Sequence, residues 1–320
     1  MTRFPGEERA MQLHVWGATD TGRMRSENQD AFLILQLNGD GTDHGFVLGP
    51  DSVAPPAVPS ATHGDPQPQD HGMGRVQVGP LGFLLLVADG MGGAAGGRVA
   101  SRLATSVIAG TLVRDLAKER IPSPARFAEH LASAVRQANA GVLDRARIRP
   151  DLSGMGTTAT VAGILDGFVY IAQVGDSRAY LIRNGKATQI TRDQSMVQEL
   201  VDQGAMTREE AERSAHRSVL LQALGTEPDV RVPLTFHRLR DGDRLLLCSD
   251  GLSGPVAHGA LESMATASPT PAEACRRLIH AANEAGGPDN ITVVIADVTS
   301  GGAMGPADEV RLRPFDPHDP

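Results

Sequence analysis

Four aspartates in this sequence lie beside predicted buried strands, each in a tight turn or a polar stretch. They are Asp89, Asp176, Asp250 and Asp289, next to the apolar segments 84–87, 169–175, 245–248 and 291–294. A strand end holds its carboxylate rigidly at the rim of a sheet, and a neighbouring glycine lets other oxygen ligands approach closely. One such aspartate alone is most often a turn former or a helix cap. Their repetition instead indicates a shared carboxylate cluster.

A carboxylate cluster of this kind predicts a cation site. Carboxylates gathered within a few ångströms raise each other's pKa unless cations neutralise them. Oxygen ligands without His or Cys favour Mg²⁺, Mn²⁺ or Ca²⁺ over zinc or copper. A paired-metal site polarises a phosphoryl oxygen and lowers the pKa of bound water from about 15.7 toward ~7. The chemistry expected here is therefore metal-assisted phosphoryl hydrolysis.

Phosphate chemistry also benefits from a guanidinium group. Arg25 ends the polar turn 22–25, just before the acidic stretch 28–30, and is the best placed basic residue. Its planar fork matches two phosphate oxygens. Local sequence alone leaves an exposed surface arginine as an equal alternative.

The glycine-rich stretch 89–97 is a poor nucleotide-binding loop. It lacks the Lys-Ser/Thr pair of a P-loop, and its spacing differs from the dinucleotide fingerprint. We expect its glycines to allow close packing around a metal held by Asp89 and the Gly90 carbonyl.

Strands and helices must position these residues, and the spacing of apolar residues in the sequence predicts where they lie. Strands are predicted near 12–19, 31–37, 83–87, 157–164, 168–174, 179–183, 187–190, 244–248 and 291–298, with a hairpin turn at Asn184-Gly185. Apolar residues at helical spacing predict helices around 99–112, 127–142 and 271–284. Two successive helices followed by strands favour a layered architecture.

Three segments differ from this pattern. Residues 38–80 are rich in Gly, Pro, Asp and His, and we interpret them as a disordered insertion because they offer little to bury. Residues 191–225 are polar and helical, an excursion from the sheets. Residues 300–320 are expected to form a disordered tail.

Composition excludes several classes of function. The chain has 320 residues, 41% hydrophobic, with a net charge of −8 and 3% aromatic residues, which argues against a nucleic-acid surface. Cys248 and Cys275 are too few for a thiolate zinc site or a disulfide framework. The sequence shows no signal peptide or membrane-length apolar run. We expect a cytoplasmic protein.

Together the motifs closely resemble the metal-dependent type-2C protein phosphatase (PPM) family, particularly its compact bacterial members. The matching stretches, in family order, are 20–30 (DTGRMRSENQD), 87–93 (VADGMGG), 154–159 (GMGTTA), 174–178 (VGDSR), 248–252 (CSDGL) and 286–290 (GGPDN). The resemblance extends over 16–298, apart from 38–80. It predicts a catalytic domain over residues 11–299.

The resemblance implies an α+β fold, a four-layer α-β-β-α sandwich with two antiparallel sheets and a metal cleft at one rim. It implies two or three Mn²⁺ or Mg²⁺ ions. Asp89 would bridge the first two ions, the Gly90 carbonyl would contribute a ligand, and Asp250 and Asp289 would complete the first ion's shell. Asp176, with Asp250, would hold a weaker third ion.

The same resemblance assigns the remaining roles. Arg25 would bind the substrate phosphate, Asp30 would support metal-bound waters, and 191–225 would form a mobile flap beside the cleft. Animal members commonly carry Glu where Gln29 stands and a His, proposed as general acid, where Met91 stands. A metal-bound water is the expected proton donor here.

The resulting hypothesis is an active protein serine/threonine phosphatase, a monomer acting on phosphorylated proteins that include a serine/threonine kinase, with neither nucleic-acid nor membrane partners. The alternative is a regulatory module of the same fold that binds a phosphoprotein or kinase without turnover. Such a module would have lost a metal aspartate, and none is missing. A structural calcium protein is disfavoured because the ligand spacing of an EF-hand is absent.

Overall fold

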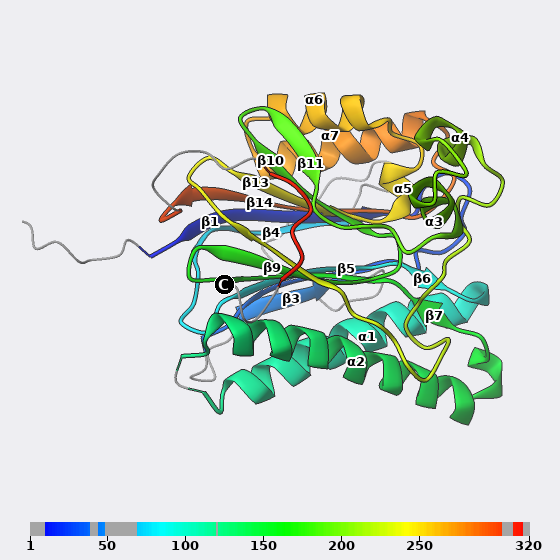
Figure 1. The fold of residues 1–320 in the computed structure, drawn as a ribbon, viewed down its shortest axis with the longest axis horizontal. Helices are drawn as coiled ribbons and strands as arrows, with labels where there is room; N and C mark the ends of the chain where they lie inside the picture. The colour runs from blue at the N-terminus through cyan, green and yellow to red at the C-terminus, as the bar shows by residue number, and fades with distance from the viewer. Residues whose placement is uncertain (1–9, 39–43, 49–68, 120, 303–309, 316–320) are drawn as a thin grey trace, which may run out of the picture.

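Two six-stranded antiparallel sheets lie face to face, and helices cover the outer side of each (Figure 1). This computed structural model describes residues 10–38, 44–48, 69–119, 121–302 and 310–315. The four-layer α-β-β-α sandwich predicted above is confirmed.

The first sheet has the strand order β11-β10-β13-β14-β1-β4. Its strands are β1 (Gln12–Asp20), β4 (Gln69–Gln77), β10 (Arg178–Arg183), β11 (Lys186–Gln189), β13 (Arg244–Cys248) and β14 (Ile291–Ser300). The hairpin predicted between β10 and β11 is present, and Asn184 and Gly185 both have positive φ, as a tight two-residue turn requires.

The second sheet has the order β12-β9-β8-β5-β2-β3. Its strands are β2 (Ala31–Gln36), β3 (His44–Leu48), β5 (Phe83–Ala88), β8 (Ala159–Leu165), β9 (Phe168–Val174) and β12 (Leu234–Arg238). A separate small ladder joins β6 (Gly90–Met91) to β7 (Gly156–Thr157).

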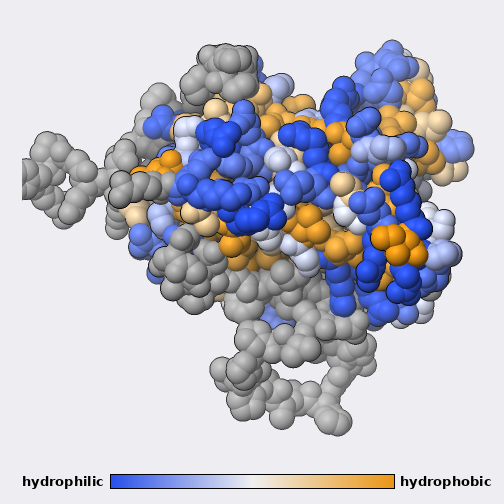
Figure 2. Space-filling view, turned by 90° about the horizontal axis from the view of Figure 1, so that it is seen from below, coloured by the Kyte–Doolittle hydropathy of each residue, from blue (hydrophilic) through white to orange (hydrophobic). Residues whose placement is uncertain are grey.

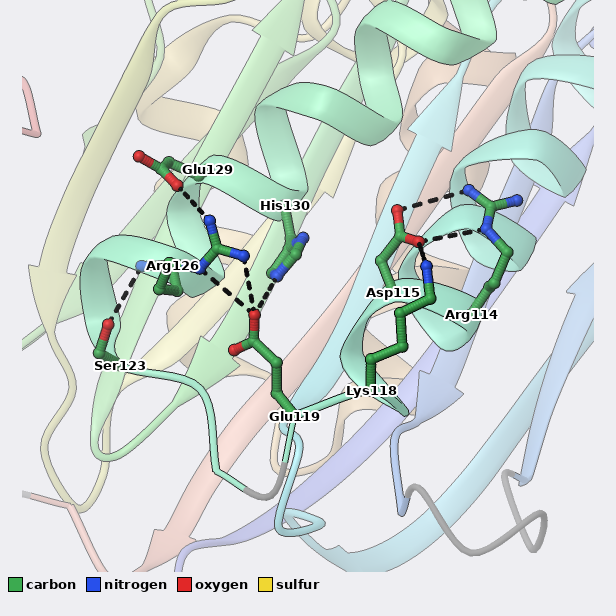
Figure 3. A network of polar contacts seen from close by, with 8 residues as sticks. All are labelled: Arg114, Asp115, Lys118, Glu119, Ser123, Arg126, Glu129 and His130. Carbon is green, nitrogen blue, oxygen red and sulfur yellow. Dashed lines mark hydrogen bonds and ion pairs between the residues drawn. The ribbon is translucent and has the colours of Figure 1, made fainter.

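Helices α1 (Gly93–Leu116) and α2 (Pro124–Ile148) cover the second sheet (Figure 1). Ser123 caps α2, with Pro124 in its first turn. Glu119 holds the connection between the helices, since Arg126 Nη2 and His130 Nε2 donate to its Oε1 over 3.0 and 2.8 Å (Figure 3). The outer face of this layer shows hydrophilic residues with smaller apolar areas between them (Figure 2).

Helices α6 (His258–Ala267) and α7 (Pro271–Glu284) cover the first sheet (Figure 1). The remaining helical pieces are η1 (Pro150–Leu152), α3 (Met196–Asp202), α4 (Arg208–Arg213) and α5 (Asp250–Ser253). Within the described residues, none of the helices combines the length and apolar character needed to cross a bilayer.

Side chains alternate between the two faces of each strand, so the buried apolar residues form three cores. One core lies between the sheets, and one lies under the helices on each outer side. On β5, Phe83, Leu85 and Val87 belong to the inter-sheet core, and Leu84, Leu86 and Ala88 belong to the core under α1 and α2. Strands buried on both faces read as continuous apolar runs. This is why 83–87 was recognisable in the sequence.

The expectation that 38–80 is disordered is wrong for the residues of β3 and β4. Strand β4 pairs with β1 from Gln12 to Thr19, and its Gly72 lies under the Trp16 ring. An edge strand is held largely by backbone hydrogen bonds, so a composition poor in apolar side chains did not reveal it. Residues 39–43 and 49–68 lie outside the described residues.

The expected disordered tail is likewise wrong for residues 310–315. Phe236 N donates to Arg313 O over 3.1 Å, and Phe315 N donates to Leu234 O over 2.9 Å, so this segment extends beside β12. The Phe315 ring contacts the rings of Tyr170 and Phe236 edge-on. Residues 303–309 and 316–320 lie outside the described part of the chain.

Candidate metal centre

At one end of the inter-sheet core, the inward-facing side chains change from apolar to polar. The next inward-facing positions after the apolar core are Thr19 on β1, Asp30 before β2, Asp89 after β5, Ser249 after β13 and Thr292 on β14. Because strand side chains alternate, four of these positions follow from a core residue two places away, and Thr19 lies four places from Val15 with Gly17 between them. The sandwich thus ends in a polar layer on both sheets.

A cleft opens above this layer. Its lining includes six of the seven residues predicted for the site, namely Arg25, Asp89, Gly90, Asp176, Asp250 and Asp289. Asp30, the seventh, is only 1% exposed and lies beneath the cleft. The structure therefore brings together side chains that are as many as 264 positions apart in the sequence.

The environment of the aspartates opposes negative charge. Burial, followed by repulsion from Asp30 and Asp250, raises the pKa of Asp89 well above its usual range. Burial, then the Asp250 charge, raises the pKa of Asp176 to about 8. Burial, then Asp289, raises the pKa of Asp250 as well. Without a cation, burial and mutual repulsion therefore shift these carboxyl groups toward the protonated form.

The donor set fits divalent cations. The Asp89 and Asp250 side chains lie close enough to shift each other's pKa, and a divalent ion between them would offset both charges. Asp250 Oδ1 is buried with no hydrogen-bond partner among the described residues. In the described part of the chain, no three His, Cys, Asp or Glu side chains gather closely enough to enclose an ion alone. Waters and the Gly90 carbonyl would have to complete the coordination, as Mg²⁺ commonly requires.

The backbone at Asp89 is fixed by the loop before β8. Asp89 N donates to Thr158 Oγ1 over 2.9 Å, and Asp89 O accepts from Thr158 N and Thr157 Oγ1, each over 2.8 Å. A Cβ on Gly90 would lie 2.2 Å from Gly97 O. Only glycine at position 90 allows α1 to begin this close to the strand.

Arg25 lies at the mouth of the cleft, with a side chain that is 55% exposed. Its Nη2 donates to Asp289 Oδ2 over 2.7 Å, and this contact is the main cause that raises its pKa. The guanidinium therefore stays charged beside the carboxylates while most of its surface faces solvent. It is placed to meet an anion entering the cleft.

Asn290 holds the loop that carries Arg25, a role that the sequence did not suggest. Its Nδ2 donates to the carbonyls of Thr21 and Glu27, each over 2.9 Å, and its Oδ1 accepts from Gln29 N over 2.7 Å. Its place beside Asp289, within the matching stretch 286–290, was the available signal. Hydrogen bonds between a side chain and a distant backbone leave no periodic pattern in a sequence.

The turn that carries Asp176 is fastened to the start of the predicted flap. Gly175 N donates to Gln194 Oε1 over 2.9 Å, and Gln194 N donates to Gly175 O over 3.0 Å. Helices α3 and α4 of the predicted flap lie at the end of the sandwich where β6 and α5 are found (Figure 1). Two further residues of this segment, Ser218 and Leu220, line the cleft.

Comparisons with known proteins find similar sequences. The family model described as "Protein phosphatase 2C" matches residues 60–291. The "Serine/threonine protein phosphatase PstP" of Mycobacterium tuberculosis (strain ATCC 25618 / H37Rv) is 44% identical over 216 residues, which are 67% of this chain and 40% of that protein. The "Serine/threonine phosphatase stp" of Listeria innocua is 37% identical over 216 residues, covering 67% of this chain and 84% of that protein.

Solved structures give the same result for the fold. The crystal structure of the M. tuberculosis phosphatase PstP/Ppp has a TM-score of 0.69 and 33% identity, covering 90% of this chain and 100% of that one. The catalytic domain of PstP in complex with two manganese ions has a TM-score of 0.67 and 33% identity, covering 91% and 100%.

Proposed function

Because this chain belongs to the protein phosphatase 2C family, we propose that it hydrolyses phosphoserine and phosphothreonine in proteins with the help of Mn²⁺ or Mg²⁺. The observation that carries the proposal is the convergence of Asp89, Asp176, Asp250, Asp289 and Arg25 on one cleft. The chain spans 40% of the length of the mycobacterial relatives, so its activity and substrates are inferred from the site and the family together.

Two or three ions would be held by the four cleft aspartates and the Gly90 carbonyl. Asp89 would contribute to two of them, and Asp250 and Asp289 to the first. Asp176, with Asp250, would hold a weaker third ion. When bound, such ions polarise a phosphoryl oxygen and supply a water acidic enough to attack near neutral pH.

The protein's own groups would orient the substrate. Arg25 would donate to two oxygens of the phosphate from the mouth of the cleft, giving up part of its contact with Asp289. Asp30 would accept a hydrogen bond from a water beneath the ions. No His, Cys or Lys side chain lines the cleft in the described residues, so the proton for the leaving oxygen would come from water.

We also propose the boundaries and setting of this activity. Residues 11–299 would form the catalytic domain, with 191–225 as a mobile flap. Cys248 and Cys275 are buried and form no disulfide, which fits a reducing compartment such as the cytoplasm. The protein would act as a monomer on phosphorylated proteins, including a serine/threonine kinase.

The competing proposal is a regulatory module that binds a phosphoprotein without hydrolysing it. Release of phosphate from a phosphothreonine peptide, after EDTA treatment and then addition of Mn²⁺, separates the two. We expect release to depend on Mn²⁺ and to saturate with peptide. Saturable peptide binding with no release of phosphate at any Mn²⁺ concentration would favour the module.

A further inference from the structure

We propose that Thr19, Ser249 and Thr292 form a hydroxyl network that positions Asp30 beneath the metal cleft. The inference rests on the proposed function, because it concerns how the site presents Asp30 to the water around the ions. It adds three positioning residues to a site described so far by its charged groups.

The sheet register places the three hydroxyls together. Thr19 on β1 is directly opposite Thr292 on β14, and Ser249 follows β13, the other neighbour of β14. All three face the inter-sheet space and are at most 1% exposed. A cross-strand Thr–Thr pair with this alignment commonly forms a side-chain hydrogen bond. Here the pair lies next to Asp30, whose carboxylate Thr292 contacts directly.

The hydrogen bonds run in one direction toward the carboxylate. Thr292 Oγ1 donates to Asp30 Oδ2 over 2.7 Å, so it must accept in its 2.7 Å contact with Thr19 Oγ1. Thr19 Oγ1 in turn accepts from Asn28 Nδ2 over 2.8 Å. Asn28 Oδ1 accepts from Asp30 N over 3.1 Å, which closes the circuit.

Ser249 supplies the second donor. Its Oγ donates to Asp30 Oδ2 over 2.7 Å and accepts from Thr292 N over 3.0 Å. Ser249 Oγ also lies 3.5 Å from Asn290 O, a longer contact than the one to Asp30. Since a hydroxyl has one hydrogen, the shorter contact to Asp30 Oδ2 is the one that it serves.

The two oxygens of Asp30 are consequently not equivalent. Oδ2 receives both hydroxyl donors, whereas Oδ1 is buried and has no partner among the described residues. The hydroxyls fix the rotation of the carboxylate and leave Oδ1 as its one unsatisfied acceptor. The charges of Asp250 and Asp289 act on Asp30, and Asp30 in turn acts on Asp89, so Asp30 lies next to the cleft aspartates.

The test combines three variants with a matched control. Thr292→Val keeps the shape and removes the hydroxyl, Thr292→Ser restores it, and Ser249→Ala removes the second donor. Ser268→Ala is the control, because Ser268 is also a buried serine with one 2.7 Å hydroxyl hydrogen bond, to Met264 O, and it lies at the opposite end of β13 beside Arg244. Each protein is titrated calorimetrically with Mn²⁺ alone and assayed for hydrolysis of p-nitrophenyl phosphate.

We expect Thr292→Val and Ser249→Ala each to weaken Mn²⁺ affinity or lower kcat by about 10-fold or more, with KM nearly unchanged. Thr292→Ser should return to within about twofold of the parent, and Ser268→Ala should match the parent even if its melting temperature falls. Should Thr292→Val not fold, Ser249→Ala decides the matter.

Two results would overturn the inference. One is a folded Ser249→Ala or Thr292→Val protein that binds Mn²⁺ and turns over like the parent; the other is an equal loss in Ser268→Ala. A parent protein that binds Mn²⁺ but hydrolyses no phosphate ester would instead refute the proposed function.

Discussion

Arg25 and Asp289 form an ion pair across the mouth of the cleft, with Arg25 Nη2 2.7 Å from Asp289 Oδ2. Asp289 is therefore both a proposed metal ligand and the partner that orients the proposed phosphate-binding group. An incoming phosphate would compete with Asp289 for the guanidinium, while an ion would compete with the guanidinium for Asp289. The two binding events are linked through this contact.

Arg25→Ala should raise KM more than it lowers kcat, if the guanidinium binds the phosphate equally in the ground and transition states. The loss in kcat/KM should be about 10–100-fold, as expected for a charged hydrogen bond. Arg25→Lys should recover only part of it, because a lysine cannot bind two oxygens in a fork. Steady-state kinetics with a phosphopeptide give both constants.

A suitable control for that series is Arg149→Ala. Arg149 is also paired with an aspartate over 2.7 Å and is similarly exposed, 51% against 55% for Arg25, but it does not line the cleft. It should leave both kinetic constants unchanged. A large loss of kcat at constant KM in Arg25→Ala would instead assign Arg25 to transition-state stabilisation.

Asp89→Asn should stabilise the metal-free protein. Burial and the neighbouring carboxylates make a charge at Asp89 unfavourable, and the substitution removes that charge without changing the shape of the side chain. In EDTA at pH 8, unfolding by urea should show a gain of about 1–3 kcal/mol. Asp144→Asn, at a side chain 67% exposed, should change stability by less than about 0.5 kcal/mol. A loss of stability in Asp89→Asn would show that the cleft tolerates its charge.

The stability of the metal-free protein should fall as pH rises from about 4 to about 8. Burial raises the pKa of Asp30 to about 7 and that of Asp176 to about 8, whereas an unfolded aspartate titrates near ~3.9. Between these values the folded state binds more protons than the unfolded state, so the free energy of unfolding decreases with pH. Mn²⁺ should oppose the decline, because it binds the ionised carboxylates.

Melting temperatures measured in EDTA at intervals from pH 5 to 8, and again with excess Mn²⁺, check this expectation. A melting temperature that stays level or rises with pH in EDTA would contradict the proposed carboxylate cluster.

Gly72→Ala tests whether β4 is an integral part of the first sheet. A Cβ on Gly72 would lie 1.9 Å from Trp16 Cε3, so the ring or the strand would have to move, at a cost of about 1–3 kcal/mol. Gly259→Ala in α6, where a Cβ meets no atom within 4 Å, is the control and should be neutral or slightly stabilising. Equal stability of the two variants by urea unfolding would argue against the pairing of β4 with β1.

The sequence located the ends of a strand well where that strand is apolar on both faces. Strand β5 and the segments before Asp250 and after Asp289 are continuous apolar runs, so their ends and the polar residues beside them could be located. The division of the strands between two sheets was expected only from the family resemblance. Periodicity reports which face of a strand is buried, but not which strand is its neighbour.

The edge strands β3 and β4 and the hydroxyl network were missed for different physical reasons. Strand β4 is held by its ladder with β1 and has few apolar side chains. Nothing in the local sequence distinguishes Thr19, Ser249 and Thr292 from ordinary residues in or beside a strand. Their hydroxyls meet only because β1 and β13 pair with β14 in this register. Extending the alternation from Val294 to Thr292, and from Val15 through Gly17 to Thr19, places both threonines on the inward face.

Metal-dependent hydrolysis in the acidic cleft is tested by comparing phosphate release from a phosphothreonine peptide by the parent and by Asp89→Asn at saturating Mn²⁺. We predict Mn²⁺-dependent release by the parent and a loss of at least about 1,000-fold in kcat for the variant, whose fold is retained, because the proposed bridging carboxylate is gone. Release by Asp89→Asn at a rate near that of the parent, or release by the parent that persists undiminished in EDTA, would contradict the account.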